Sequence, residues 1–525
     1  MGTSEDWGYK TEPQYEACRG YKNRRCAWPR GKTLGGSSSI NAMFYVRGNK
    51  YDYQEWADQG NYGWSYDDVL PYFKKSENYS GDSTEDTRKY HGSNGYLHVE
   101  NDENMDNLEK LILNAVNELG IPILDDVNAY SQMGVSKSWM TIKEGMRHST
   151  ARAFLSPIKH RRNLHVVKNG YVTKLIFIPN TNKVTGVLIS KDGKEVIVNA
   201  KKEVIVSAGA INTPQLLLLS GIGPSKQLKY LNINVKSDLP VGQNLQDHLF
   251  VPFYYTLPGI GNTTTLNNFA TEFVRYITTR KGTLSDTSPH RIITFYNTTD
   301  NRSSNPDVQF HYLVFPPSLY NVIDILKHHD LSEEIQEKYR KINDVNFIIV
   351  VYCTVLQPKS KGKVILKSKD PYEYPLIYAN YFDDPEDMTT LINGFKQHVA
   401  KLGETNTLKN SGFKLEWLDI DECKEYKKGS YEHLECYCRQ MTFSLYHPVS
   451  TARMGPIDDK NSVVDPDLRV KNIKNLRVID ASIMPNIVRG NTNAPTIMIG
   501  EKGADLIKEF WLPSQYLYEL PRSEF

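Results

Sequence analysis

The chain has 525 residues, long enough for two to four domains, and its 39% hydrophobic content is that of an ordinary globular protein. With 63 basic and 61 acidic side chains the formal net charge is only +2, which gives no support for nucleic acid or an anionic membrane as partner. No run of about 18 apolar residues and no charged-then-apolar leader is present, so we expect neither a membrane span nor a signal peptide, and a small neutral substrate.

Residues 1–29 are polar, aromatic and irregular, and we expect them to form an extended arm. The next stretch, residues 30–48, reads RGKTLGGSSSINAMFYVRG. Gly35 and Gly36 can adopt backbone angles that are closed to other residues, which lets main-chain N–H groups approach a ligand closely. With three serines, Asn41 and a closing arginine, this stretch predicts a cradle around a polyanionic ligand.

Three helices are expected before residue 160. Ser65 can cap a helix in which, or near which, Pro71 lies. Residues 105–119 form an amphipathic pattern that is closed by Gly120 and Pro122, and a third helix begins near residue 147 and ends near 157.

Residues 164–206 contain short β-rich runs separated by turn signals, which predict a small antiparallel sheet. The stretch KKEVIVSAGAINTPQLLLLSGIGP follows. We expect a buried strand over 204–206, a turn over 207–210, and a helix with Thr213 as N-cap and Pro214 at its first position. A strand, a small turn and a helix N-terminus can bind a phosphate or a nucleotide, but the same arrangement can also bind nothing.

The region 250–450 holds strand patterns such as VQFHYLV and FIIVVYCTVL, and charged helices over 331–341 and 387–402. This pattern predicts a second domain built on an antiparallel sheet with helices to one side. A further buried strand is expected over 476–479, ending at Asp480, and a final helix from Thr496.

The six cysteines are not spaced as zinc ligands are, so no metal site is predicted. They are either buried thiols or, if the protein is secreted, two disulfides that join Cys18 to Cys26 and Cys423 to Cys436. Glycosylation sequons begin at Asn78, Asn262, Asn297 and Asn301. They would fit secretion, but a chain this rich in asparagine produces about that many sequons by chance. The compartment stays open on these grounds.

Five blocks of this sequence, in this order, resemble the glucose–methanol–choline (GMC) oxidoreductases: GKTLGGSSSINAMFYVRG, SAGAINTPQLLLLSGIGP, VGQNLQDH, HPVSTARMG and NTNAPTIMIGEKGADLI. The arm, with DWGYKTEP and ACRGYKNRRCAWPRG, is most similar to the insect branch of that family, whose members are commonly described as FAD- and quinone-dependent glucose dehydrogenases. The blocks span nearly the whole chain.

The resemblance implies an α/β fold, α+β overall, with a Rossmann-like FAD/NAD(P)-binding domain that is incomplete at its N-terminus and a substrate domain with an antiparallel sheet and helices. We assign residues 1–50, 160–250 and 455–511 to the first domain and residues 51–159 and 251–454 to the second. Residues 512–525 are expected to form a tail.

The resemblance also implies oxidation of a CH–OH group of an alcohol or sugar, with hydride passing to flavin N5 and electrons passing on to a quinone or to oxygen. In the family the base is the histidine of the HP…MG block, here His447, and a histidine that titrates near neutrality suits that task. Pro448 keeps His447 out of the α region. Matching the N-A-P-T motif places the second site residue, which hydrogen-bonds the substrate oxygen, at Asn493.

For the cofactor, the family match assigns cradle residues to FAD, namely Gly35, Gly36, Ser37 and Asn41. It assigns a main-chain contact near the adenine to Val172, and the remaining contacts to Ala208, Asp480 and Ala481. Some relatives tether FAD through a histidine where this chain has Ile40, which cannot form that bond. We therefore expect non-covalent FAD.

Family members open with a strand, a G-x-G-x-x-G turn and a helix, a unit of about 30 residues that binds the ADP half of FAD. This chain starts after that unit, and neither Gly221-Ile-Gly223 nor Gly259-Ile-Gly261 replaces it. We expect either a longer protein whose start is absent from this sequence or a variant with weakened FAD binding. A non-catalytic GMC-like protein is the alternative, although the intact His447 and Asn493 favour an enzyme. The resemblance implies an extracellular location.

Overall fold

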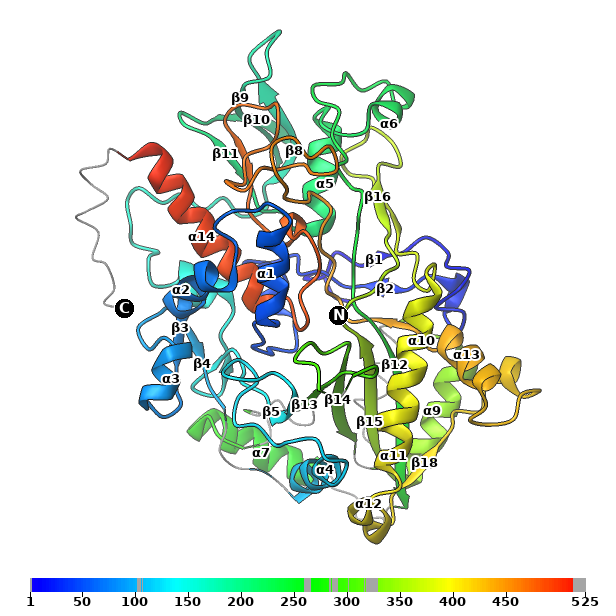
Figure 1. The fold of residues 1–525 in the computed structure, drawn as a ribbon. Coiled ribbons are helices and arrows are strands. Elements are labelled where there is room, and N and C mark those ends of the chain that lie inside the picture. Colours follow the sequence, from blue (N-terminus) through cyan, green and yellow to red (C-terminus); the bar gives the residue numbers. More distant parts are fainter. Residues whose placement is uncertain are drawn as a thin grey trace.

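The computed structural model describes residues 2–512 except 102–104, 106, 259–265, 283–284, 286–290, 301, 316 and 318–328. The sequons at Asn262 and Asn301, the stretch 259–261 and the tail beyond residue 512 therefore lie outside the described residues. In Figure 1 a large sheet lies in the lower half of the molecule and a smaller sheet lies at the top.

The large sheet is the predicted antiparallel sheet, and it has seven strands in the described part of the chain. Their order is β18-β12-β15-β14-β13-β5, with β19 pairing with β12. β12 and β15 are aromatic and β-branched and are buried for most of their length, as expected for central strands. The strands are β5 (Gly134–Lys137), β12 (Leu249–Pro258), β13 (Ile292–Tyr296), β14 (Val308–Phe315), β15 (Asn346–Val355), β18 (Lys414–Glu416) and β19 (Phe443–Ser444).

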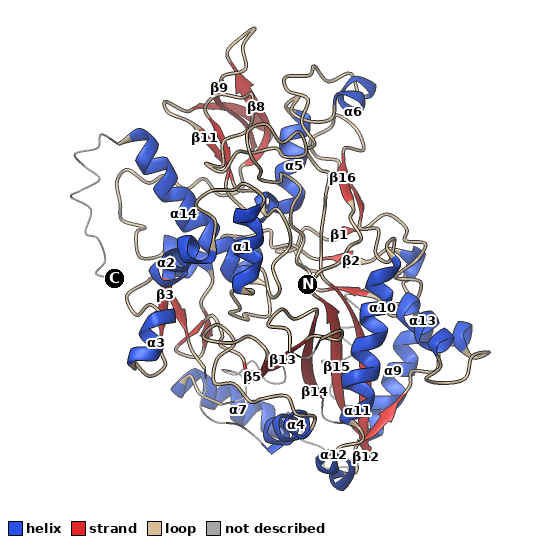
Figure 2. Cartoon of the chain, in the orientation of Figure 1, coloured by secondary structure: helices blue, strands red, loops and turns tan. Residues whose placement is uncertain are grey.

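Helices flank this sheet (Figure 2). α9 and α10 pack against β15, while α4 packs against β5 and β13. The predicted helix over 387–402 is interrupted by a π-helical turn, Phe395–Val399, which joins α10 to α11. The helices of this region are α4 (Asn107–Glu118), α7 (Leu266–Thr279), α9 (Glu333–Val345), α10 (Pro385–Gly394), α11 (Ala400–Leu402), α12 (Asn406–Ser411) and α13 (Tyr431–Gln440).

The second region is built on two parallel strands, β11 (Val204–Val206) and β20 (Leu476–Val478), which pair in register from Val204 with Leu476 to Val206 with Val478. Each strand leads toward a helix, α5 (Gly209–Leu219) and α14 (Asn493–Trp511). The predicted small antiparallel sheet is confirmed as β8 (Tyr171–Phe177), β9 (Val184–Lys191) and β10 (Lys194–Asn199).

The remaining elements are short. The predicted cap at Ser65 is confirmed, because Ser65 and Asp68 form a capping box at the start of α2, which continues through Pro71. The helices are α1 (Lys50–Asp58), α2 (Tyr66–Ser76), α3 (Glu85–Tyr90) and α6 (Ser225–Tyr230); the strands are β1 (Tyr9–Lys10), β2 (Ala27–Trp28), β3 (Glu77–Tyr79), β4 (Leu97–Val99), β6 (Ile142–Lys143), β7 (Met146–Arg147), β16 (Lys363–Ile365) and β17 (Leu376–Tyr378).

The predicted N-cap of α5 at Thr213 is wrong: the N-cap is Ala208, five residues earlier, and the helix begins at Gly209. Gly209 has a φ of +84°, so the chain turns directly from the strand into the helix. Pro214 then lies inside the helix and cannot donate to the carbonyl of Ala210. The hydroxyl of Thr451 donates to that carbonyl instead, at 2.8 Å.

Two further helix predictions also needed correction. The last helix begins at Asn493 and not at Thr496. The helix expected over 147–157 is reduced to a π-helical turn, Ala151–Leu155.

Two large hydrophobic cores follow the two regions, but two segments pack differently from the predicted domain division. Tyr9 and Trp28 of the N-terminal arm belong to the core of the large sheet. Trp56 and Phe73, from the segment 51–159, belong to the core around the parallel strands. The division itself stays a prediction.

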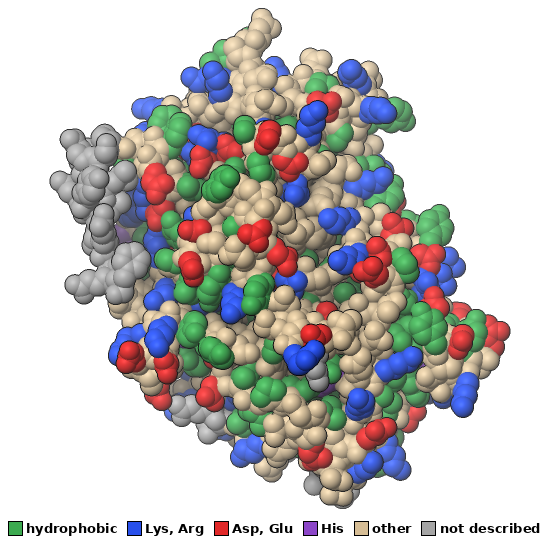
Figure 3. All heavy atoms as spheres, viewed as in Figure 1, with side chains coloured by type: hydrophobic (Ala, Val, Ile, Leu, Met, Phe, Trp, Pro, Cys, Tyr) green, Lys and Arg blue, Asp and Glu red, His purple; other side chains and the backbone are tan. Residues whose placement is uncertain are grey.

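The surface agrees with the near-neutral charge. On the face shown in Figure 3, basic and acidic side chains are interspersed and neither sign dominates. None of the helices among the described residues is long and apolar enough to cross a membrane.

Candidate active site

The site begins where the two parallel strands end. Because parallel strands present their carboxyl ends at one edge, the residues after β11 and β20 lie together there. The carboxylate of Asp480 accepts hydrogen bonds from the N–H of Gly209 at 2.8 Å and from the hydroxyl of Thr213 at 2.6 Å, and it also accepts from the N–H of Ser482 at 2.8 Å. Asp480 therefore joins the end of one strand to the first turn of α5.

The predicted cradle is a 3-10 helical turn, Gly36–Ser39, entered through Gly35 with a φ of +88°. Its fold is held by a neighbouring segment. The hydroxyl of Ser38 donates to the carbonyl of Gly35 at 2.6 Å and accepts from the N–H of Thr150 at 3.0 Å, while Arg147 donates to the Oδ1 atom of Asn41 at 2.8 Å. The segment after β7 thus fixes the shape of the cradle.

The closing arginine of the cradle stretch, Arg47, does not face a ligand as its place in the sequence had led us to expect. Its side chain is 1% exposed, and it forms an ion pair at 2.7 Å with the fully buried Glu77. His91 lies between that carboxylate and Asp126, at 3.2 and 2.7 Å respectively. Arg47 therefore anchors the end of the cradle stretch to β3.

A cavity of about 950 Å³ connects the two regions of the molecule. It is bounded by the cradle, by the starts of α5 and α14, and by side chains of the large sheet, including Phe250, His311 and Tyr352. Most of the predicted site residues line it: Gly36, Ser37, Asn41, Ala208, His447, Asp480, Ala481 and Asn493.

Two predicted cofactor residues are not brought to this cavity. Gly35 shapes the turn of the cradle, where a Cβ atom would lie 2.5 Å from the hydroxyl of Ser39. Val172 lies on β8, at the surface, and it is not among the residues that line the cavity in the described part of the chain.

His447 lies three residues after the end of β19 and is buried at the wall of the cavity. Its main-chain N–H donates to the Oδ1 atom of Asp247 at 2.7 Å, and its Nδ1 atom is 2.9 Å from Nδ1 of His248. Its Nε2 atom is 3.4 Å from the amide nitrogen of Asn491. Burial, together with the nearby His248 and Arg30, lowers the pKa of His447 well below its ordinary value, so the ring is neutral near pH 7.

The amide of Asn491 faces His447, and the predicted Asn493, two residues later, lines the same cavity; its role at the substrate oxygen stays a prediction. α14 begins at Asn493, after Thr492 as N-cap, so Asn493 is part of the first helical turn. Asn491 comes from the loop before the helix, following Gly490, where a Cβ atom would come within 2.5 Å of Val46. Both asparagines occur in the same short stretch, and only the position of the helix start distinguishes them.

Sequence reasoning also missed the residues that hold His447. Asp247 and His248 belong to the VGQNLQDH block, to which no role had been assigned. Arg30, at the start of the cradle stretch, donates to the carbonyl of Tyr446 at 2.6 Å, and burial lowers its pKa. The sequence signal that could have pointed to these residues is their place in blocks shared with the family. Their contacts could not be foreseen, because they join parts of the chain up to 416 residues apart.

Three glycines lining the cavity leave room for close approach of a ligand. At Gly36, Gly209 and Gly500 a Cβ atom would meet nothing within 4 Å. The N-termini of α5 and α14 also open onto the cavity, where main-chain N–H groups favour an anion. The cavity thus suits an elongated ligand with an anionic part held at the strand ends and a flat part placed near His447.

Comparison with known proteins shows which sequences and folds this chain resembles. Two family models described as GMC oxidoreductase match residues 14–250 and 358–500. Glucose dehydrogenase (FAD, quinone) of Drosophila melanogaster is 39% identical over 518 residues, covering 97% of this chain and 79% of that protein. Ecdysone oxidase of Spodoptera littoralis is 36% identical over 512 residues, covering 96% and 83% respectively. A solved structure of formate oxidase from Aspergillus oryzae RIB40 has a TM-score of 0.81 at 25% identity, covering 97% of this chain and 89% of that chain.

Proposed function

The chain belongs to the GMC oxidoreductase family, FAD-dependent enzymes that act on alcohols and sugars, and within that family we propose a dehydrogenase in which His447 is the base. The observation that carries this proposal is the pair formed by Nε2 of His447 and the amide nitrogen of Asn491, 3.4 Å apart at the wall of the cavity. A base beside a hydrogen-bond donor suits removal of a hydroxyl proton.

The cavity fits FAD. Gly36 and Gly209 leave space where a Cβ atom would otherwise point, and the N-termini of α5 and α14 favour the negative charge of a pyrophosphate. We propose that the cradle with Ser37 and Asn41, and the strand end with Asp480 and Ala481, hold the cofactor. FAD supplies the acceptor for the hydride that leaves the alcohol carbon.

His447 and Asn491 divide the work on the substrate hydroxyl. Nε2 of His447 takes the proton from the oxygen, and the carbon–oxygen bond becomes a carbonyl as hydride leaves the same carbon. The amide of Asn491 donates a hydrogen bond to that oxygen and stabilises the negative charge that develops on it. Phe250 and Tyr352, on neighbouring strands of the large sheet, line the same cavity and exclude water from it.

Reoxidation and substrate preference are the finer parts of this proposal. The Drosophila relative is named for a quinone, and we propose a quinone as the electron acceptor here, in preference to oxygen. We propose an alcohol or sugar that presents an apolar face to the aromatic wall of the cavity, where Phe250 and Tyr352 stack at 4.1 Å between ring centroids.

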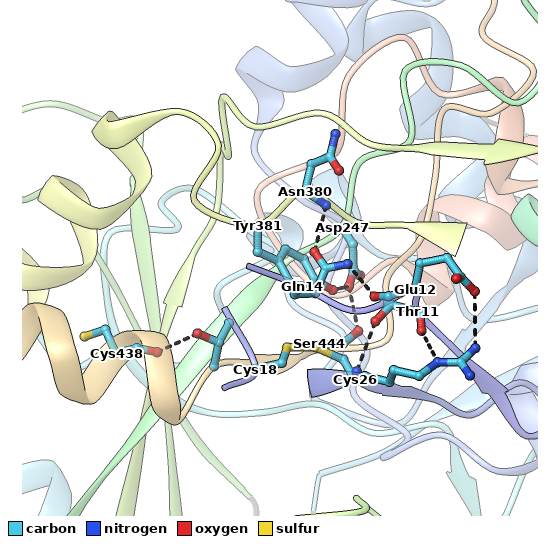
Figure 4. Close-up of a disulfide and its surroundings, with 12 residues drawn as sticks. Thr11, Glu12, Gln14, Cys18, Cys26, Asp247, Asn380, Tyr381, Cys438 and Ser444 are labelled. Atoms are coloured by element: carbon cyan, nitrogen blue, oxygen red, sulfur yellow. Dashed lines mark hydrogen bonds and ion pairs between the residues drawn. A yellow bond between two sulfur atoms is a disulfide. The ribbon is translucent and has the colours of Figure 1, made fainter. Parts of the chain in front are cut away.

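An extracellular location is also proposed, on the basis of the cysteines. Both disulfides considered from the sequence are formed: Cys18 with Cys26, drawn in Figure 4, and Cys423 with Cys436. The other two cysteines, Cys353 and Cys438, are buried thiols. Two disulfides in one chain support an oxidising compartment, because thiols stay reduced in the cytosol.

The test is anaerobic reduction of the bound flavin by a panel of alcohols and sugars. The loss of the flavin's visible absorbance measures the rate of reduction. We expect His447→Ala to retain flavin but to reduce it about 10²- to 10⁴-fold more slowly, the usual contribution of a general base. His433→Ala is the control, since His433 is buried on α13 and does not line the cavity. A His447→Ala variant that reduces flavin at the wild-type rate contradicts the proposal, and failure of every alcohol and sugar with wild type favours a non-catalytic protein.

Because Ile40 lines the cavity where some family members carry the tethering histidine, we propose that FAD is held without a covalent bond. Acid precipitation of the loaded protein should release the flavin into the supernatant. Flavin that stays in the protein pellet after repeated washing contradicts this part of the proposal.

A further inference from the structure

The block VGQNLQDH has no role in the mechanism described so far, although it lies against the proposed base. Its last residues run antiparallel to the segment that carries His447. Main-chain hydrogen bonds join Leu445 N–H to the carbonyl of His248 at 2.7 Å and Val449 N–H to the carbonyl of Gln246 at 2.9 Å. These bonds lie on both sides of His447, so the backbone around the base is fixed before any side chain is considered.

The side chain of Asp247 fixes the same segment a second time. Oδ1 accepts from the main-chain N–H of His447, and Oδ2 accepts from the hydroxyl of Ser444 at 2.6 Å and from the phenol of Tyr381. Figure 4 shows Asp247, Ser444 and Tyr381 close together, beside the disulfide of the N-terminal arm. The hydrogen bonds accepted by Asp247 therefore fix His447, the nearby Ser444 and the loop that carries Tyr381.

The neighbouring His248 contacts the imidazole of the base itself. Its Nε2 atom is 3.0 Å from the main-chain carbonyl of Leu356, and its Nδ1 atom is 2.9 Å from Nδ1 of His447. A carbonyl only accepts hydrogen bonds, so Nε2 of His248 must carry a proton. Burial lowers the pKa of His248 to about 4, although hydrogen bonds to the main chain of Leu356 and Val488 act in the opposite direction, so the ring is neutral near pH 7. With the proton of the neutral ring on Nε2, toward Leu356, Nδ1 has none.

The tautomer of His447 follows from this arrangement. Since Nδ1 of His248 is an acceptor, Nδ1 of His447 must donate to it. The ring of His447 is neutral and has one N–H, so its Nε2 atom is unprotonated and its lone pair can accept a proton or a hydrogen bond. That atom is the one that lies 3.4 Å from the amide of Asn491, at the cavity. The contacts that run from the carbonyl of Leu356 through His248 to His447 thus leave Nε2 of His447 unprotonated, at the place where a substrate hydroxyl would lie.

We propose that His248 is a positioning residue: held by the carbonyl of Leu356, it fixes His447 in the Nδ1–H tautomer and so directs the lone pair of Nε2 into the cavity. The proposal rests on the role of His447 as base. After Nε2 takes the proton, Nδ1–H still donates to His248, so the proton transfer requires no rearrangement of this pair. His248 contacts the cavity only through His447, because it is not itself among the described residues that line it.

Two substitutions at this position separate tautomer control from packing. His248→Leu removes both ring nitrogens and leaves Nδ1 of His447 without an acceptor. His248→Asn places an amide oxygen where Nδ1 lies and keeps an acceptor for His447. The matched control is His398→Leu. His398 is equally buried, forms a hydrogen bond with the phenol of Tyr312 on the large sheet, and does not line the cavity.

The kinetic readout is the rate of flavin reduction in flavin-loaded enzyme, measured as a function of substrate concentration and pH. In serine-type triads a wrong histidine tautomer lowers kcat about 10⁴-fold, and we expect at least about 10²-fold here for His248→Leu, with KM changed less than about threefold. His248→Asn should recover to within about tenfold of wild type. The pH at which activity rises should shift in His248→Leu, where Arg30, His311 and Asp247 remain as the other charged or titratable groups near the base.

The second readout does not depend on flavin or on activity. In protein labelled with ¹⁵N-histidine, the ring nitrogens of His447, assigned by loss of signal in His447→Ala, should show a protonated Nδ1 and a bare Nε2 in wild type. His248→Leu should shift both signals toward a mixture of tautomers, and His398→Leu should leave them unchanged.

A His248→Leu variant that keeps the wild-type rate within about threefold, or that leaves the ¹⁵N signals of His447 unchanged, overturns the inference. Failure of the proposed function looks different: His447→Ala would then stay active. If His447→Ala is inactive and His248→Leu is not, the base stands and only the positioning role falls.

Discussion

Replacing Glu77 by glutamine removes the negative charge that balances the buried guanidinium of Arg47. The carboxylate accepts from Arg47 at 2.7 Å, from the N–H of Gly92 at 3.0 Å and lies 3.2 Å from Nδ1 of His91, and both members of the ion pair are 1% exposed or less. Removing one member of such a pair costs about 3–5 kcal/mol of folding free energy, because the other charge is left buried and unbalanced.

The assay is urea unfolding monitored by tryptophan fluorescence, since Trp56 and Trp64 share a hydrophobic core with Phe73, whose ring lies 5.4 Å from the guanidinium of Arg47. For a cooperative unit of about 250 residues, the expected loss also lowers the thermal midpoint by about 6–10 °C. Asp86→Asn is the matched control: it breaks the ion pair of Asp86 with Lys89, which is exposed, and should have no measurable effect.

The double variant Arg47→Met with Glu77→Leu tests the cause of the loss. It removes both charges and fills the space with apolar groups, so it should be more stable than Glu77→Gln alone. A Glu77→Gln variant that loses less than about 1 kcal/mol, or a double variant that is less stable than the single one, refutes the assignment of Arg47 as an anchor of the cradle stretch.

Three other outcomes are expected. Gly209→Ala and Gly193→Ala, both at positive φ with open space at Cβ, should each cost about 1–2 kcal/mol, but only Gly209→Ala should weaken FAD binding, measured by flavin titration of the apoprotein. Cys423→Ser opens a loop of 13 residues and should lower the free energy of unfolding by about 3 kcal/mol, and reductant should then change the transition less than in wild type, because only the Cys18–Cys26 disulfide remains to be reduced. The pKa of His248 is about 4 in the folded protein and 6.5 ordinarily, so on acidification the unfolded chain binds a proton first. The free energy of unfolding should therefore be highest above pH 6.5 and fall as the pH is lowered to about 4. Urea titrations at each pH measure this fall, which should be smaller in His248→Leu.

Local patterns predicted the elements well where one segment decides its own structure. The aromatic and β-branched runs around residues 308–315 and 346–355 are strands of a buried sheet, and Ser65 caps the helix that follows it. The cradle, the strand over 204–206 and the histidine proposed as base all come from short blocks with their own backbone requirements. These features depend on neighbours within a few residues, which the sequence displays directly.

Predictions failed where a distant partner changes a local preference. Thr213 is a residue type that often serves as an N-cap, yet Asp480 accepts a hydrogen bond from the N–H of Gly209 and the helix starts there. Thr451 donates to the carbonyl of Ala210, which Pro214 cannot reach with an N–H of its own. Arg47 resembled a ligand for an anion, but Glu77 takes its charge.

By itself, the sequence determined the family, the cradle and His447 as the histidine to consider. Only the tertiary structure decided that the amide of Asn491 lies 3.4 Å from Nε2 of the proposed base, and that His248, 199 residues away in the chain, lies 2.9 Å from its Nδ1 atom. The physical reason is that a tautomer and a hydrogen-bond direction are set by atoms within about 3 Å in space, and the order of residues along the chain does not specify which atoms those are.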